Sequence, residues 1–204
     1  MFDIILTTKK PLILASSSPR RSELLSILEV PFQVKTIEID ESNIFGANPA
    51  EKVCNTAMAK GIQVSKIFKD SIVISADTIV FINEEPLIKP KNNQMAIQYL
   101  KMLSGKTHSV YTGVSIFNSG KCYPFYEKTS VQFYPLSDEW IQAYVESGEG
   151  TDKAGGYGIQ GAGGLFVKEM MGDYHNVVGL PIGKLFKQLQ ALNLISFGEE
   201  GGLS

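Results

Sequence analysis

The chain has 204 residues, of which 44% are hydrophobic and 20% are charged, a composition typical of a folded, water-soluble protein. Nineteen Lys and Arg residues against 21 Asp and Glu give a net charge of −2, which argues against broad binding to nucleic acid or acidic membranes. No apolar run reaches a membrane span of roughly 18–20 residues. The first lysines follow a short apolar run instead of preceding it, unlike a secretory signal. We therefore expect a cytoplasmic protein with a single domain over residues 1–204.

The predicted elements alternate between strands and helices, which favours a mixed α/β fold. In chain order they are a strand at 12–15, a helix from 19, a strand at 32–39, a helix opening at 48–51, a strand at 72–81, a helix at about 94–103, hairpin strands at about 109–117 and 123–134, a helix from 137 to about 148, a glycine-rich irregular segment at 150–164, and a helix from 181. The tail from about residue 198 is predicted to be disordered.

Residues 16–21, between the first strand and the first helix, have the sequence Ser-Ser-Ser-Pro-Arg-Arg. Ser18 is a typical N-cap, but Arg20 and Arg21 are unfavourable in the first turn, because the helix dipole prefers acidic side chains there. A bound phosphate would resolve this conflict, since guanidinium groups match phosphate oxygens. Two solvated arginines behind a serine cap are the alternative interpretation.

Lys60 falls on the apolar stripe of the second predicted helix. With about 100° per residue, this stripe also contains Val53, Ala57, Val64 and Ile67. A lysine in this position either extends its ammonium to the edge of the stripe or points into a polar cavity. The helix pattern alone does not choose between the two.

Asp77 interrupts the apolar, β-branched run of residues 72–81. An unpaired buried carboxylate is costly, so it requires a cation, a metal or hydrogen-bond donors. Asp77 therefore either caps a loop at the strand end or emerges into a cleft. Lys89, which precedes Pro90 in a short extended segment, is a weaker candidate for a cation in the same cleft.

Six glycines lie between residues 155 and 164, and they let the backbone approach a ligand closely. Gln160, among them, offers both a donor and an acceptor. A flexible surface loop is the alternative, which Tyr157 and Ile159 disfavour. Together the candidate residues supply cations, one carboxylate, a helix N-terminus and an amide. This combination suits the binding of a polyphosphate ester that carries a base.

Five segments of the chain resemble the Maf family of nucleoside triphosphate pyrophosphatases, in the order found in that family and from about residue 12 to residue 190. They are residues 14–21, 75–80, 104–108, 152–161 and 176–181. The resemblance implies an elongated mixed sheet flanked by helices, with two lobes around a deep cleft. It also implies hydrolysis between the α and β phosphates of a nucleotide, with a divalent cation, Mg²⁺ or Mn²⁺, as cofactor.

The resemblance further suggests roles for individual residues. Asp77 falls where the family has its catalytic acidic residue, so we expect it to orient and deprotonate the attacking water, alone or through a bound metal. Glu41 resembles a further acidic residue of the family and is the second expected metal ligand, beside Asp77. Ile88 stands where the family usually has glutamate. The polar and basic cleft positions of the family correspond to Ser16, Arg20, Arg21, Lys60 and Lys89.

Three positions, Arg20, Thr78 and Gln160, match the family group that hydrolyses dTTP and UTP rather than its sister group for 7-methylguanine nucleotides. One amide can pair with both the N3–H donor and the carbonyl acceptors of uracil and thymine, whereas the adjacent donors of guanine suit a carboxylate. We therefore expect dTTP and UTP as substrates. The alternatives are a 7-methyl-GTP-type pyrophosphatase and a nucleotide-binding regulator of cell division with little turnover. We expect neither a nucleic acid polymer nor a membrane as partner, and a homodimer is an open alternative to a monomer.

Overall fold

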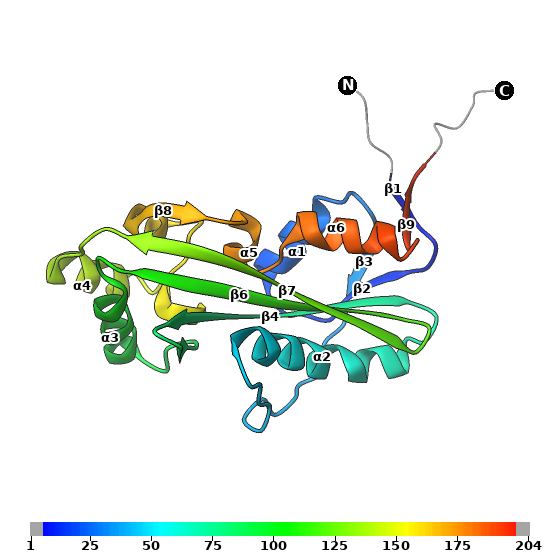
Figure 1. Ribbon diagram of the computed structural model, residues 1–204, viewed down its shortest axis with the longest axis horizontal. Coiled ribbons are helices and arrows are strands. Elements are labelled where there is room, and N and C mark those ends of the chain that lie inside the picture. Colours follow the sequence, from blue (N-terminus) through cyan, green and yellow to red (C-terminus); the bar gives the residue numbers. More distant parts are fainter. Residues whose placement is uncertain (1–5, 199–204) are drawn as a thin grey trace.

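The computed structural model describes residues 6–198, which form an elongated mixed α/β molecule (Figure 1). Its main sheet has seven strands, in the order β3-β2-β4-β6-β7-β8 with β5 paired to β4, and β1 and β9 form a separate two-stranded sheet. The strands are β1 (Leu6–Thr8), β2 (Leu12–Leu14), β3 (Phe32–Val34), β4 (Ile72–Ile82), β5 (Glu85–Leu87), β6 (Thr107–Asn118), β7 (Lys121–Phe133), β8 (Val167–Met171) and β9 (Ile195–Phe197). The α-helices are α1 (Pro19–Ser26), α2 (Pro49–Ile67), α3 (Asn93–Leu103), α4 (Asp138–Glu146), α5 (Tyr174–Val178) and α6 (Ile182–Ala191). The expected fold class is confirmed.

Three long antiparallel strands, β4, β6 and β7, run the length of the molecule (Figure 1). The β6–β7 hairpin turns at Ser119 and Gly120, which both have positive φ, at 50° and 77°. Such a two-residue turn matches the right-handed twist of the paired strands. The predicted hairpin is therefore confirmed.

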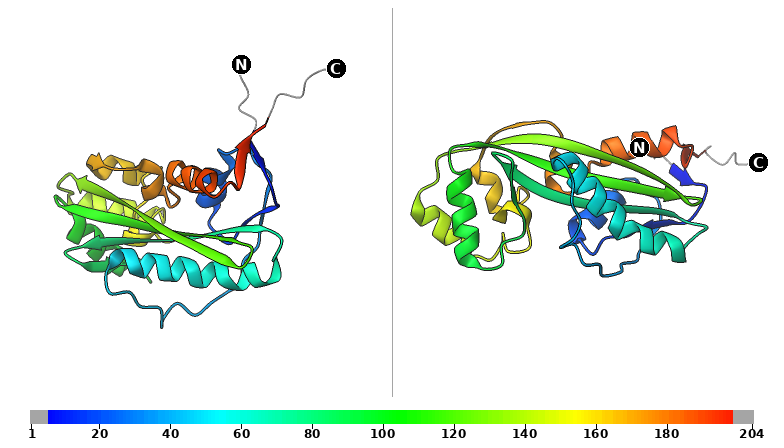
Figure 2. Two further views of the ribbon diagram at one scale, coloured as in Figure 1. Left: turned by 45° about the vertical axis from the view of Figure 1, so that its right-hand side comes forward. Right: turned by 60° about the horizontal axis from the view of Figure 1, so that its bottom comes forward.

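Helices cover both faces of the sheet and divide its apolar surface into two large cores. The long helix α2 lies on one face, and α1 and α6 lie on the other (Figure 2). One core packs α1 and α6 against the start of β4, including Ile72 and Ile74. The other packs α3 and α4 against the far end of β4, including Val80 and Ile82. One strand thus contributes to both cores, and its middle lies between them.

The middle of β4 is an open edge of the sheet. β6 pairs with β4 along one side over residues 73–81. On the opposite side β2 pairs with residues 72–74 and β5 with residues 80–82, and within the described part of the chain no strand pairs with residues 75–79 on that side. Successive strand residues point to opposite faces. Asp77 faces α2, whereas Thr78 faces α1. Because no strand covers this edge, the side chains of Asp77 and Thr78 both reach the space beside the strand.

Helix α2 approaches the sheet unusually closely because two glycines leave room for it. A Cβ atom at Gly113 of β6 would lie 2.3 Å from the carbonyl carbon of Val53 in α2. A Cβ atom at Gly61 of α2 would lie 2.3 Å from the Phe117 ring and 2.4 Å from the Ser75 hydroxyl oxygen. The two glycines therefore set the height of α2 above the sheet, and with it the position of Lys60.

We expect Gly113→Ala to push α2 away from β6. The added methyl meets backbone, which cannot rotate away, so the free energy of unfolding should fall by about 3 kcal/mol, the upper end of the overpacking range. The nucleotide hydrolysis expected from the resemblance should slow as well, since Lys60 moves with the helix. Urea unfolding and steady-state kinetics measure the two effects. Gly183→Ala in α6 is the control, because a Cβ atom there meets nothing within 4 Å; equal stability of the two variants would contradict the close-approach argument.

Some elements differ from the sequence-based expectation. The predicted strand at 32–39 is shorter, ending at Val34, and the glycine-rich segment contains two short 3₁₀ helices, at Ala154–Gly156 and Ala162–Phe166. The short strands β1, β5, β8 and β9 and the helix α5 were not predicted, since elements of three to five residues carry little periodicity. Most of the predicted disordered tail, residues 199–204, lies outside the described residues. Within residues 6–198, no helix is both long enough and apolar enough to cross a membrane.

Candidate active site

A cavity of about 840 Å³ opens at the unpaired edge of β4. It reaches from the N-terminus of α1 on one side to the glycine-rich segment on the other. The predicted site residues that line it are Arg20, Arg21, Glu41, Lys60, Asp77, Thr78, Lys89 and Gln160. The folded chain thus brings together eight residues from six separate segments of the sequence.

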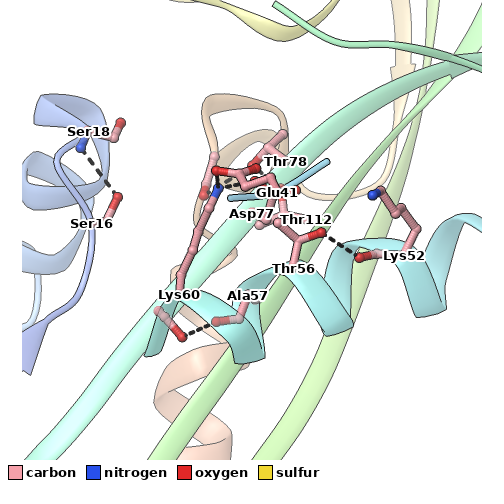
Figure 3. Close-up of polar contacts among 12 residues, drawn as sticks. Ser16, Ser18, Glu41, Lys52, Thr56, Ala57, Lys60, Asp77, Thr78 and Thr112 are labelled. Atoms are coloured by element: carbon pink, nitrogen blue, oxygen red, sulfur yellow. Dashed lines mark hydrogen bonds and ion pairs between the residues drawn. The ribbon is translucent and has the colours of Figure 1, made fainter. Parts of the chain in front are cut away.

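The carboxylate of Asp77 pairs with Lys60 inside this cavity. The Lys60 ammonium lies 2.6 Å from Oδ1 of Asp77 and 3.0 Å from Oε1 of Glu41. Figure 3 shows the lysine side chain extending from α2 towards both carboxylates. Of the two interpretations of Lys60, the polar cavity is therefore the one observed. Asp77 emerges into a cleft rather than capping a loop.

Glu41 belongs to a loop that is fastened to α2. The Lys52 ammonium donates to the carbonyl of Ile44, and the Asn55 amide donates to the carbonyl of Phe45 at 2.8 Å. These contacts hold the loop over the helix that carries Lys60. They explain how a half-exposed glutamate, distant in sequence from Asp77, comes to share its lysine.

Arg21 is bound into the wall of the cavity by three acceptors. Its Nε donates to the carbonyl of Gly179 at 2.9 Å, and its two terminal nitrogens donate to Ser16 Oγ at 3.1 Å and Thr78 Oγ1 at 3.0 Å. Burial lowers the pKa of Arg21, and the negative charge of Asp77 partly offsets that effect. Two of the five guanidinium N–H groups make none of these contacts, and Arg21 lines the same cavity as Asp77.

Ser16 does not line the cavity but lies behind it. Its hydroxyl oxygen accepts from Arg21 and from the backbone N–H of Ser18, at 3.1 and 3.3 Å. Direct substrate binding by Ser16 stays a prediction. Ser18 is the N-cap residue of α1, as predicted, but its side chain makes no capping hydrogen bond. The first turn of α1 contains no acidic residue, so the helix N-terminus keeps its positive potential.

Arg20 faces Asp152 across the mouth of the cavity. Its Nη1 lies 2.8 Å from Oδ2 of Asp152, whose other oxygen accepts from Lys153 at 2.7 Å. Burial acts to raise the pKa of Asp152, but the hydrogen bonds from Lys153 and Arg20 outweigh it and hold the pKa at about 2. Neither arginine is simply solvated, so the alternative interpretation of residues 16–21 is wrong.

A buried polar network fixes α5 against the sheet. Thr78 Oγ1 lies 2.9 Å from the hydroxyl of Thr112, which donates to the carbonyl of Asn176 at 2.9 Å. The Asn176 amide donates to the carbonyl of Val110 and to Thr129 Oγ1. This network places Gly179, the residue after α5, under Arg21. In the sequence, this network corresponds to segment 176–181, one of the five segments that carry the family resemblance.

The glycine-rich segment is anchored by a buried aromatic contact. The Tyr157 hydroxyl lies 2.8 Å from Nε2 of His108, and burial lowers the pKa of His108 to about 4. His108 is therefore neutral near pH 7. Tyr157 is itself 5% exposed, so the segment is not a flexible surface loop, and the alternative interpretation of residues 150–164 is wrong.

Comparison with known proteins identifies the family of the chain. The family model described as Maf-like protein matches residues 11–192. The chain belongs to the Maf family. Two proteins of Bacillus cereus named dTTP/UTP pyrophosphatase, from strains AH187 and ATCC 10987, are each 46% identical to this Maf-family chain over 185 residues. Both matches cover 91% of this chain. They cover 97% of the AH187 protein and 91% of the ATCC 10987 protein. A relative of the same name from Bacillus anthracis strain CDC 684 is 46% identical as well.

Among solved structures, the Ham1 protein of Staphylococcus aureus is similar to part of the chain, with a TM-score of 0.46 and 15% identity. That match covers 61% of this Maf-family chain and 72% of the Ham1 chain.

Of the four carboxylates that line the cavity, Glu41 and Asp77 are the two that share one lysine, and carboxylate oxygens are the ligands that Mg²⁺ and Mn²⁺ prefer. Both carboxylates lie within 3.0 Å of one positive charge, the Lys60 ammonium. Within residues 6–198, no group of three or more His, Cys, Asp or Glu side chains is arranged to hold a metal. One or two carboxylates completed by substrate phosphates is, however, a donor set that Mg²⁺ uses in proteins. The donor chemistry of Glu41 and Asp77 therefore fits such a metal.

Proposed function

We propose that this Maf-family chain hydrolyses dTTP and UTP to the monophosphate and pyrophosphate. The observation that carries the proposal is one cavity in which the Asp77–Lys60 pair faces the Arg20 and Arg21 turn at a helix N-terminus. A nucleotide-binding regulator needs only the cations, because a carboxylate beside a bound polyphosphate weakens binding. The names of relatives at 46% identity support the same activity.

In this proposal the triphosphate lies against the first turn of α1. Arg20 and Arg21 bind phosphate oxygens, together with the unpaired N–H groups of the helix N-terminus. Arg20 exchanges its contact with Asp152 for the substrate, while Arg21 keeps its protein contacts and offers its remaining N–H groups. Lys89, from the opposite wall, adds a further positive charge. These cations stabilise the negative charge that grows on the leaving pyrophosphate.

Asp77 acts on the water that attacks the α phosphorus. Its carboxylate orients the water and accepts one proton, while a new bond forms from the water oxygen to the α phosphorus and the bond to the bridging oxygen of the β phosphate breaks. Lys60 holds the Asp77 carboxylate in place at 2.6 Å. Asp77 and Glu41 would hold a bound Mg²⁺ or Mn²⁺, which supplies Lewis-acid stabilisation of the phosphate charge.

The substrate class is tested with a panel of nucleotides. Purified chain is incubated with dTTP, UTP, GTP, ATP and 7-methyl-GTP in the presence of Mg²⁺ or Mn²⁺, and the released pyrophosphate and monophosphate are quantified. We expect dTTP and UTP to give the highest kcat/KM. Faster turnover of GTP or 7-methyl-GTP would overturn the pyrimidine assignment and leave the reaction intact. Binding without pyrophosphate release would favour the regulator.

Gln160 is the residue we expect to recognise the base. Its amide can donate to a carbonyl and accept from N3–H of uracil or thymine, and a carboxylate there can only accept. Gln160→Glu should therefore lower kcat/KM for dTTP and UTP by about tenfold or more, since one carbonyl of the base then loses its donor. Kinetics on both pyrimidine nucleotides and on GTP measure this effect. Unchanged pyrimidine turnover would show that Gln160 does not touch the base.

The proposal also treats residues 1–204 as a single domain that acts in the cytoplasm on a small nucleotide, with neither a nucleic acid polymer nor a membrane as partner. Both cysteines, Cys54 and Cys122, are free, which agrees with a reducing compartment. Light scattering after size-exclusion chromatography tests whether the chain is a monomer or a homodimer.

A further inference from the structure

Glu149 lines the cavity, but its carboxylate is directed at the protein backbone. Its Oε2 accepts from the N–H of Ala162 at 2.9 Å, and its Oε1 accepts from the N–H of Gly163 and the hydroxyl of Tyr144, both at 3.1 Å. Desolvation acts to raise the pKa of Glu149, but the hydrogen bonds from Gly163, Ala162 and Tyr144 outweigh it and the pKa is lowered. The group is therefore a charged acceptor engaged by three donors.

Tyr144 extends this arrangement to the other side of Gln160. Its hydroxyl oxygen accepts from the N–H of Gly158 at 2.9 Å while its proton is donated to Glu149. The turn from Gly158 to Gly163 is thus fastened before Gln160 by the tyrosine and after it by the glutamate. A Cβ atom at Gly163 would lie 2.6 Å from the carbonyl oxygen of Gly158, so the two ends of the turn are in contact.

The glutamate also fills the inside of the turn. A Cβ atom at Gly161 would lie 2.6 Å from the carboxyl carbon and from both oxygens of Glu149. The neighbouring Ile159 packs against both large apolar cores, which fixes the start of the turn. Gln160 is consequently carried by a closed loop with a charged centre, and its backbone has little freedom.

From these contacts we propose that Glu149, acting together with Tyr144, is a positioning residue that sets the preference for uracil and thymine. This inference rests on the proposed function of the cavity and on base recognition by Gln160. Selective hydrogen bonding requires that the amide be held to within about 0.5 Å, which a side chain on a free glycine loop cannot achieve. We assign Glu149 no part in the reaction itself, because its two oxygens already accept from Ala162, Gly163 and Tyr144.

The test is Glu149→Gln, which keeps the shape of the side chain and replaces one acceptor oxygen with an NH₂ group. One donor of the turn then loses its partner, and the turn becomes mobile. We expect KM for dTTP and UTP to rise about tenfold, with kcat within about twofold of the parent. The ratio of kcat/KM for UTP to that for GTP should fall about tenfold. The inhibition constant of inorganic triphosphate should not change, since this probe has no base.

Tyr144→Phe is the second variant, because it removes the hydroxyl and keeps the ring contact with Phe166, whose centroid lies 4.8 Å away. It should raise KM in the same way and carries the test if Glu149→Gln does not fold. Glu146→Gln is the matched control: this exposed glutamate of the same helix accepts only from Gln142 among the described residues, and its loss should change neither KM nor the UTP to GTP ratio.

Several outcomes would overturn the inference. A fall in kcat of at least about 100-fold at constant KM would place Glu149 in the chemistry instead. An equal loss for UTP, GTP and inorganic triphosphate would show a general structural role, and parent-like kinetics would show none. Calorimetric binding of UMP separates this inference from the proposed function. A parent chain that binds UMP but releases pyrophosphate from no nucleotide lacks the proposed activity. In that case a weaker UMP affinity of Glu149→Gln would still support the positioning role. A parent that binds neither UMP nor dTMP would overturn both.

Discussion

Asp77→Asn should leave a folded chain that binds nucleotide but turns over at least about 100-fold more slowly, the scale expected for loss of a positioned general base. The asparagine amide cannot accept a proton from water, although it fills the same space at the open edge of β4. Lys60 keeps its contact with Glu41 at 3.0 Å, so the ammonium is not left without a partner. The loss should therefore appear in kcat and only weakly in KM.

The measurement is steady-state pyrophosphate release, combined with calorimetric binding of dTTP in the presence of Ca²⁺ to slow turnover. Asp70→Asn is a suitable control, because Asp70 is exposed in the turn before β4 and lies outside the cavity. Near-parent turnover of folded Asp77→Asn would remove this residue from the mechanism.

Arg21→Ala should cost both activity and stability, whereas Arg20→Ala should cost activity alone. Removing the Arg21 guanidinium leaves the Gly179 carbonyl and the hydroxyls of Ser16 and Thr78 without their donor. We expect the free energy of unfolding to fall by about 2–4 kcal/mol, since several partly buried polar groups lose a partner together. The kcat/KM for dTTP should fall at least about 100-fold, because the wall beside Asp77 loses both its charge and its shape.

Arg20 makes a more exposed contact, with Asp152, and such pairs contribute at most about 1 kcal/mol. Its replacement should chiefly raise KM, and added salt should weaken dTTP binding by the parent in the same direction. Urea unfolding and kinetics at two ionic strengths separate the two arginines. Lys101→Ala breaks the exposed pair with Asp138 and is the control for loss of a surface cation. Equal stability of the Arg21→Ala and Arg20→Ala variants would contradict the wall contacts described for Arg21.

The local patterns of the sequence were sufficient to predict the long strands and helices. The β-branched run at residues 72–81 forms β4, and the periodic apolar residues after Asn48 form α2. Local preference and burial agree in these segments, so little tertiary information is needed to assign them. The short strands and α5 were missed because pairing and the Asn176 network, not periodicity, stabilise them.

What the sequence determined by itself was the set of residues that violate local rules: a carboxylate in a buried strand, a lysine on an apolar stripe and two arginines at the start of a helix. Each is unfavourable locally, so each indicated a partner elsewhere in the chain. Only the tertiary structure shows which residues these partners are. Arg21 and Gly179 are 158 positions apart, and Asp77 and Thr78 share a cavity only because β4 has an open edge there. Glu149 violates no local rule in the turn after α4. Its proposed role is visible only in the folded chain, where the turn at Gln160 closes around its carboxylate, because contacts between distant segments leave no pattern along the chain.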